Sequence, residues 1–126
     1  MPEPSEFNHE TKRLSVSLFE EQQSVAPSIE ILDTLPLDTQ LLLAYCLSRN
    51  TKDLTLLKSD SIGDPLVGQK WLVPLFCPTR AVSCFRIKPQ VWHELRLLSS
   101  FFLQIELVSK LEGFIGRKSA EYPWNW

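Results

Sequence analysis

The strongest apolar run in the first half of the chain, residues 39–48, reads TQLLLAYCLS and predicts a buried helix. Asp38 precedes this run, where its carboxylate can accept hydrogen bonds from the free N–H groups of the first turn. Leu37 and Leu42 occupy the positions of a hydrophobic staple around that cap. Asn50 favours the end of the helix. We therefore expect the first strong element of the chain to lie between Asp38 and Asn50.

A strand and a short helix are predicted next. Residues 52–57 place leucines at alternate positions, which is the pattern of a short half-buried strand. A helix start follows at the pair Asp64-Pro65, because a proline at the first helical position loses no hydrogen bond. The sequence predicts that this helix covers residues 65–71. Its inward side chains are expected to be Leu66, Val67 and Trp71.

Two further apolar runs, residues 72–76 and 82–88, predict a pair of strands. The connection between them, CPTRA, is short enough for a hairpin. Pro74 favours an edge position for the first strand of the pair, because proline has no N–H to donate to a neighbouring strand. The sequence therefore predicts a β-hairpin ahead of the last helix.

The last predicted helix is the longest, and it runs from Pro89 to the region of Gly113 and Gly116. Apolar residues recur on it at intervals of four and three, the spacing of one buried helix face. This seam consists of Val91, Leu95, Leu98, Phe102 and Ile105. Other apolar residues widen the face beyond one stripe. We expect one side of the helix to pack on the core and a second side to stay uncovered.

The first 34 residues differ from the rest of the chain in charge. They hold seven acidic side chains against two basic ones, whereas residues 35–126 hold eleven basic against eight acidic. Residues 14–18, LSVSL, predict a short strand, and residues 28–32 alternate in the same way more weakly. We divide the chain into an acidic N-terminal arm with a short strand, residues 1–34, and one domain of residues 35–126. The asymmetry is compatible with a polyanion partner, with an arm that folds back, and with a solvated tail.

Length and composition are those of a small globular protein. The chain has 126 residues, enough for one domain, and its apolar and charged fractions of 44% and 22% are ordinary. No apolar stretch is long enough to span a bilayer, and the polar, acidic N-terminus does not resemble a signal peptide. The three cysteines are an odd number, which without a secretory signal favours reduced thiols. We therefore expect a cytoplasmic protein.

The order of elements between residues 35 and 95 carries a resemblance. It comprises a helix opened by an acidic residue, a short polar-apolar stretch, an Asp-Pro helix with a Leu-Val exit, and a strand pair with its closing helix. These pieces are Asp38–Leu47, Leu54–Leu56, Asp64–Val73 and Phe85–Leu95. They resemble the winged-helix-like soluble region of the superinfection-exclusion B family of phage and prophage proteins. The resemblance implies an α+β fold with a winged-helix-like core, a β-hairpin wing and a long C-terminal helix.

The same resemblance implies a mobile-element or prokaryotic setting. This chain lacks the membrane segments expected of that family, and its last predicted helix is longer than the module needs. Exclusion of phage is therefore not carried over to this chain.

Two interpretations of the last helix remain open. If its second side is uncovered, it marks an interface, and the protein is a non-catalytic interaction module that binds a second copy or another protein. If the N-terminal strands wrap the helix, the same residues belong to the core. The two C-terminal tryptophans are either interface anchors or fold back on the domain. The leading hypothesis is a homodimer or protein-partner interface formed by Leu97, Phe101, Leu107, Leu111, Phe114, Trp124 and Trp126.

An alternative function is duplex DNA binding. The predicted hairpin region, residues 74–89, carries basic side chains and no acidic one. As a wing it would lie along a nucleic-acid backbone, where Lys and Arg contact phosphates. The competing interpretation is a solvated hairpin that its charges keep soluble. The residues proposed for DNA contact are Lys70, Arg80, Arg86 and Lys88.

Catalytic and metal-binding patterns are weak in this sequence. Cys77 and Cys84 are separated by six residues, whereas the cysteines of structural zinc sites stand two to four apart and come with two further ligands. His93 is most simply a helix-surface residue, and no serine or cysteine stands with it in a nucleophile pattern. The four glycines form no phosphate-binding loop. The sequence therefore predicts no enzyme, no cofactor and no metal.

Overall fold

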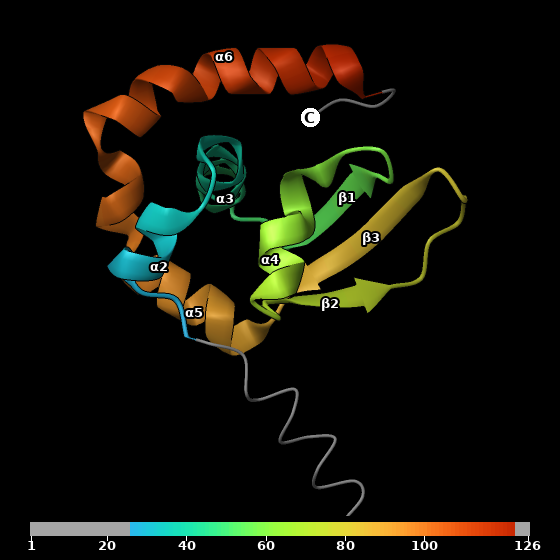
Figure 1. Cartoon of the computed structure of the whole chain (residues 1–126), viewed down its shortest axis with the longest axis horizontal. Coiled ribbons are helices and arrows are strands. Elements are labelled where there is room, and N and C mark those ends of the chain that lie inside the picture. The colour runs from blue at the N-terminus through green and yellow to red at the C-terminus, as the bar shows by residue number, and fades with distance from the viewer. Residues whose placement is uncertain (1–25, 123–126) are drawn as a thin grey trace, which may run out of the picture.

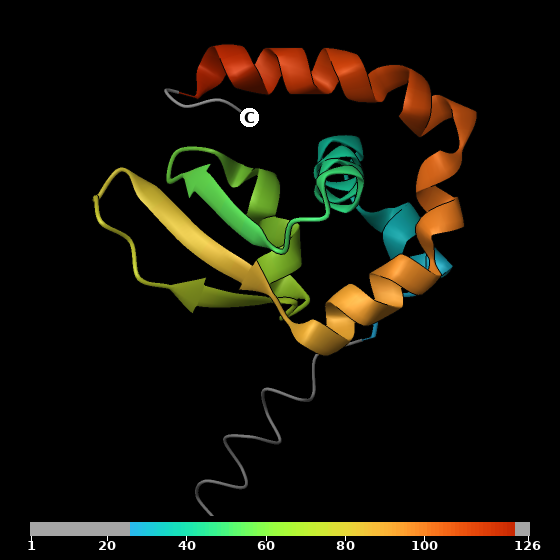
Figure 2. The ribbon, with the colours of Figure 1, turned by 180° about the vertical axis from the view of Figure 1, so that it is seen from behind.

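The structure is a computed structural model that describes residues 26–122. It joins a small antiparallel sheet to a set of helices, so the predicted α+β class is confirmed. In Figures 1 and 2 the C-terminal third of the chain forms an arc around helix α3, and the sheet lies at the open side of that arc. The elements are α2 (Ile29–Thr34), α3 (Leu37–Arg49), β1 (Asp53–Leu57), the 3-10 turn η1 (Ser61–Gly63), α4 (Asp64–Gly68), β2 (Leu72–Leu75), β3 (Val82–Ile87), α5 (Pro89–Leu97), the 3-10 turn η2 (Ser99–Leu103) and α6 (Ile105–Glu121).

Helix α3 is the centre of the helical layer, and its predicted end at Asn50 is confirmed. Asn50 takes the left-handed conformation, with φ 53° and ψ 44°, and its N–H bonds back to the last turn of the helix. The predicted cap is wrong, because Pro36 occupies the capping position and Asp38 lies inside the first turn. There the carboxylate of Asp38 is favourably placed at the positive end of the helix dipole. The apolar side chains of α3 fill the core: Leu41, Leu42, Leu43, Ala44 and Cys46.

Helix α2 replaces the weak strand that was predicted over residues 28–32. Ser28 caps it, since the Ser28 hydroxyl accepts a hydrogen bond from the N–H of Ile31 at 3.3 Å. Leu32 is fully buried in the core, and Gln40 on α3 donates a side-chain hydrogen bond to its carbonyl at 2.8 Å. The capped helix is therefore more stable here than the strand that the weak alternation of apolar and polar residues predicted. The strand predicted over residues 14–18 lies outside the described residues.

The sheet has the order β1-β3-β2, and both neighbouring pairs are antiparallel. The predicted β2–β3 hairpin is confirmed, and so is the edge position of Pro74 on β2. Register pairs Leu54 with Phe85 and Leu72 with Ile87. Because paired residues share a face, Leu54 and Ile87 point to the side of the sheet that the core covers.

Helix α4 is shorter than predicted and ends at Gly68. Leu66 and Trp71 are buried as expected, but Val67 is 48% exposed, so its predicted inward position is wrong. Val67 follows the buried Leu66 by one residue, about 100° around the helix, and so it points away from the core. After the helix, Lys70 takes the left-handed conformation before β2 begins. Just before α4, Gly63 packs closely on β1, since a Cβ there would lie 2.7 Å from Cδ1 of Leu56 and that side chain would have to shift.

The single long helix predicted from Pro89 onward is wrong, because it is broken twice. Helix α5 ends at Leu97, η2 follows, and α6 begins at Ile105 after Gln104 adopts an extended backbone at φ −61° and ψ 142°. Ser99 and Ser100 are weak helix formers at the first break. Helix α6, with 17 residues, is the long C-terminal helix of the fold. Among residues 26–122 no helix combines the length and the apolar character needed to cross a membrane.

Candidate interaction surface at the bend between α5 and α6

The bend between α5 and α6 exposes large apolar side chains. We call Leu97, Leu103, Ile105 and Val108 the bend surface; their exposed fractions are 66%, 72%, 86% and 51%. All four lie within twelve consecutive residues of the sequence. Single exposed leucines are normal on a protein surface, but several large apolar side chains exposed close together along the chain are typical of an interaction site.

The bend exposes these residues because others take the inward positions. Phe101 and Phe102 are both buried, and their rings meet edge to face with centroids 5.2 Å apart. On α6, Leu107 and Phe114 are buried and lie seven residues apart, so they share one face of the helix. Ile105 precedes Phe114 by nine residues, which is about half a helical turn out of phase at 100° per residue. Ile105 therefore points away from the core.

Helix α5 adds a shallow pocket to this region. Its inward face is formed by Val91, Trp92 and Leu95, which are buried. A pocket of about 450 Å³ is lined by Trp92, His93, Arg96 and Leu97. Leu97 belongs both to this pocket and to the bend surface. The pocket thus offers an indole, an imidazole and a guanidinium beside an apolar wall.

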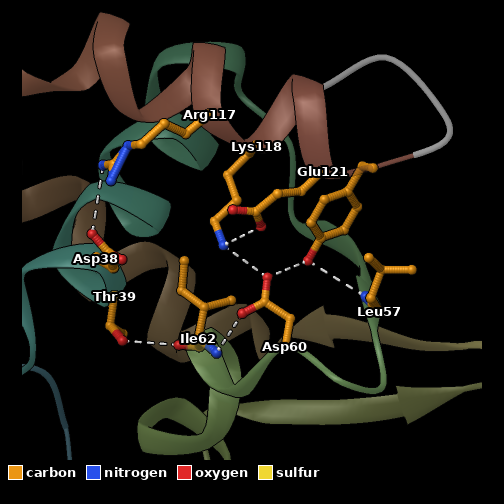
Figure 3. Close-up of polar contacts among 9 residues, drawn as sticks. Asp38, Thr39, Leu57, Asp60, Ile62, Arg117, Lys118 and Glu121 are labelled. Carbon is orange, nitrogen blue, oxygen red and sulfur yellow. Dashed lines mark hydrogen bonds and ion pairs between the residues drawn. The ribbon is translucent and has the colours of Figure 1, made fainter.

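The far end of α6 is held by a cluster of polar side chains that reaches across to the sheet (Figure 3). The ammonium of Lys118 lies 2.9 Å from Asp60 Oδ2 and 3.2 Å from Glu121 Oε1. Tyr122 Oη donates to Asp60 Oδ2 at 2.7 Å and accepts from the N–H of Leu57 at 3.4 Å. The cluster joins the end of α6 to the last residue of β1 and to the loop that follows it.

The charges in this cluster are stabilised despite their burial. Burial acts to raise the pKa of Asp60, but hydrogen bonds from Lys118, from Tyr122 and from the N–H of Ile62 outweigh it and hold that pKa below its ordinary value. Burial likewise acts to lower the pKa of Lys118, and its bonds to Asp60 and Glu121 reverse the direction. The pKa of Tyr122 is raised, first by burial and then by its hydrogen bond to Asp60. All three groups therefore keep their ordinary protonation states at neutral pH.

The structure corrects the interface that the sequence predicted. Phe101, Leu107 and Phe114 are buried inside a single copy of the chain, so their assignment to an uncovered face is wrong. Leu111 is half-buried against the core, and only Leu97 is as exposed as expected. Trp124 and Trp126 lie outside the described residues. Ile105, which the sequence placed in the buried seam, is the most exposed residue of the bend surface.

One local signal accounts for the residues that the sequence prediction missed. In a continuous helix, residues at a fixed spacing point to the same side of the axis. Here the helix is interrupted at Leu98 and at Gln104, and each interruption changes the side to which the following apolar residues point. The second break is fixed locally, because the Gln104 side-chain amide donates to the carbonyl of Phe101 at 2.8 Å. The pair Ser99-Ser100 is the only sequence feature that points to the break.

The four basic residues proposed for DNA contact differ in their surroundings. Lys70 and Arg80 are exposed, but Lys88 is buried. Arg86 forms a two-bonded ion pair with Asp53 of β1, at 2.7 and 3.1 Å. The hydrogen bond from Arg86 also holds the pKa of Asp53 below its ordinary value. The hairpin contains no acidic residue, but the neighbouring strand β1 supplies Asp53. The local sequence of the hairpin does not predict this ion pair, because it depends on the strand order.

Across residues 26–122, no cluster of three or more His, Cys, Asp or Glu side chains is arranged to hold a metal ion. The fold and the bend surface together define a small α+β protein with an apolar surface at a helix corner. Comparison with protein-family models, with curated proteins and with solved structures gives no match to this chain. The resemblance to the superinfection-exclusion B family and the winged-helix arrangement therefore stay predictions.

Proposed function

We propose that this protein is a non-catalytic interaction module that self-associates through the bend surface. The observation that supports it is the exposure of Leu97, Leu103, Ile105 and Val108, each by more than half, at one corner of the fold. Four aliphatic side chains exposed to this extent leave on the order of 400 Å² of apolar surface. A patch of this size is unfavourable to leave in water and is within the range of interaction sites.

A second copy fits the charges that surround the patch. A twofold contact uses the same surface of both copies, so that residue i of one copy meets residue j of the other and j meets i, and the surface must be complementary to itself. Glu106 and Lys110, which stand 3.9 Å apart on α6, and Arg96 on α5 place both signs of charge beside the apolar residues. A surface with both signs can pair with its own copy, whereas a surface with a single sign would repel it.

The size of the patch sets the expected strength of the dimer. Two copies of the bend surface would bury on the order of 800 Å² in total, below the 1,200–2,000 Å² of standard interfaces. The pocket on α5 shares Leu97, and we therefore include it in the contact. The dimer is expected to be weak, with a dissociation constant on the order of micromolar.

Light scattering over a concentration series tests this proposal. The wild-type chain is expected to shift from monomer to dimer as its concentration rises through the micromolar range. Ile105→Asp places a charge at the centre of the contact and is expected to keep the chain monomeric. The matched control is Phe76→Asp, because Phe76 is 88% exposed but lies beyond β2, away from the bend. A wild-type chain that stays monomeric at all concentrations, or a Phe76 variant that behaves like the Ile105 variant, would refute the proposal.

We also propose a cytoplasmic location, which the three free cysteines support. Duplex DNA binding through the hairpin stays the alternative function. It has less support than self-association, since the burial of Lys88 and the pairing of Arg86 leave Lys70 and Arg80 as its exposed cations.

A further inference from the structure

Cys77 and Cys84 lie on the outer face of the β2–β3 hairpin. Register pairs Leu75 with Cys84, and Cys77 follows Leu75 by two residues, so the two cysteines are diagonal neighbours across the hairpin. Cys84 also pairs with Thr55 on β1, whereas the buried Leu54 and Leu56 of that strand point to the opposite face. Figure 2 views the sheet from behind, where no helix of residues 26–122 lies across these strands.

The two cysteines are neighbours on the hairpin, and each is partly exposed to solvent. Each is free, half-buried and not part of a disulfide. Interaction with the Cys77 side chain raises the pKa of Cys84, and interaction with Thr55 acts in the opposite direction. Cys77 lies beyond the last residue of β2, where no strand pairing fixes the backbone, so a local shift there can bring the two Cβ atoms to the roughly 4 Å that a disulfide requires.

We propose that Cys77 and Cys84 form an oxidisable dithiol, which a small disulfide such as oxidised glutathione converts into an intramolecular disulfide. One thiolate attacks a sulfur of the oxidant, forms a mixed disulfide and releases one reduced glutathione. The second protein thiol then attacks the bonded protein sulfur and releases the other glutathione. Two thiols are thus oxidised and one disulfide is reduced, with two protons passing to the two glutathione thiols.

The roles of the two thiols are set by their surroundings. The interaction with Cys77, and then burial, raise the pKa of Cys84, so Cys84 keeps its proton to higher pH than an isolated thiol. Cys77 lies beyond the end of β2, whereas Cys84 lies in β3 between two paired strands, and we therefore expect Cys77 to react first and Cys84 to resolve the mixed disulfide. The third cysteine is an internal control. Cys46 is fully buried in α3, and burial raises its pKa to about 12, so it should stay reduced.

The disulfide would restrain the tip of the hairpin. It closes a loop of eight residues, 77–84, at the end of β2 and the start of β3. The exposed Arg80 lies inside this loop, and the exposed Phe76 lies next to Cys77. Because the crosslink lowers the entropy of the unfolded chain, oxidation is expected to raise the midpoint of thermal unfolding by about 5–10 °C.

The test treats the reduced full-length chain with oxidised glutathione, traps free thiols with N-ethylmaleimide, and measures intact mass and cysteine-containing peptides. The wild-type chain is expected to lose two hydrogen atoms, to join the Cys77 and Cys84 peptides, and to leave Cys46 reduced. Cys84→Ser is expected to stop at one glutathione on Cys77. Cys46→Ser is the matched control and should form the same disulfide as the wild type.

Three outcomes would overturn the inference. They are a wild-type chain that does not react, one that accumulates stable glutathione adducts without closing the bond, and one that forms disulfide-linked dimers instead. Thermal unfolding of the oxidised and reduced chains gives a second readout, and an oxidised chain that is less stable than the reduced one would also contradict the geometry proposed here. None of these results depends on self-association through the bend surface.

Discussion

Replacing Asp60 by asparagine tests how the end of α6 is held. Asp60→Asn keeps the shape of the side chain and an oxygen that can accept from Tyr122, but it removes the negative charge. The Lys118 side chain is only 9% exposed, so its ammonium would lose its nearest counter-charge while remaining inside the protein. The change therefore separates the charge of Asp60 from its packing.

The magnitude follows from the burial of the pair. Removing one partner of a buried ion pair costs about 3–5 kcal/mol, because the other charge is left unpaired. Here Glu121 remains 3.2 Å from the ammonium and is half exposed, which offsets part of that cost. We expect Asp60→Asn to lower the free energy of unfolding by about 2–3 kcal/mol. This is a large fraction of the 5–15 kcal/mol typical of a small domain.

The control is the same substitution at Asp38, whose ion pair is exposed to solvent. Asp38 and Arg117 stand 3.8 Å apart, with both side chains more than half exposed, so Asp38→Asn is expected to cost about 0.5 kcal/mol or less. Urea unfolding followed by the fluorescence of the buried Trp71 and Trp92 measures both variants. With a slope of about 1–3 kcal/mol per molar urea, the midpoint of Asp60→Asn should fall by about 1–2 M. Equal midpoints for the two variants would refute the reasoning.

The pH dependence of stability gives the same prediction a second readout. The pKa of Asp60 is lower in the folded state than in the unfolded chain. The folded state therefore binds fewer protons, and the stabilisation is complete above the unfolded pKa of about 4 and is lost as pH falls through the folded pKa. In Asp60→Asn this acid-side loss should be smaller than in the wild type, as measured by urea unfolding between pH 3 and 7.

Three further predictions concern other parts of the fold. Gly116→Ala should raise the free energy of unfolding by about 0.5–1 kcal/mol in urea titrations, because a Cβ there meets no atom within 4 Å and glycine weakens a helix interior. Gly63→Ala should lower it by about 1–3 kcal/mol in the same titrations, since the new Cβ would overlap the Leu56 side chain. On a duplex DNA column at low salt we expect no retention, because Lys70 and Arg80 supply too few phosphate contacts. Salt-sensitive retention that Arg80→Ala abolishes would instead support the alternative function.

Much of the fold follows from local sequence signals that agree with tertiary packing. The end of α3 at Asn50, the β2–β3 hairpin and the edge position of Pro74 were all predictable, since each depends on backbone preferences of the residue concerned. Helix α2 was missed, because its residues alternate weakly in hydrophobicity and the capping hydroxyl of Ser28 decides in favour of the helix. The predicted cap at Asp38 was wrong by two positions, since Pro36 occupies the capping position before α3 begins at Leu37.

The candidate site was harder to predict than the fold. Exposure of Ile105 depends on the phase of α6 relative to α5, and that phase is set by the two breaks around η2. Pairing of Arg86 with Asp53 depends on strand order, which places β1 beside β3. The placement of Cys77 beside Cys84 depends on hairpin register. Strand order is set by long-range contacts, whereas the helix phase and the hairpin register are set by local backbone geometry, and periodicity along a single sequence reports neither.

The orientation of α6 that exposes Ile105 and buries Phe114 has a lower free energy than the orientation turned by half a turn. Rotating the helix by about half a turn would bury Ile105 and gain about 2–3 kcal/mol, but it would carry the fully buried Phe114 into water at a similar cost. The same rotation would pull Lys118 away from Asp60, which adds the cost of breaking a buried ion pair. Packing inside residues 26–122 therefore holds the bend surface in its exposed state, and water can be excluded from Ile105 only by a surface that these residues do not provide.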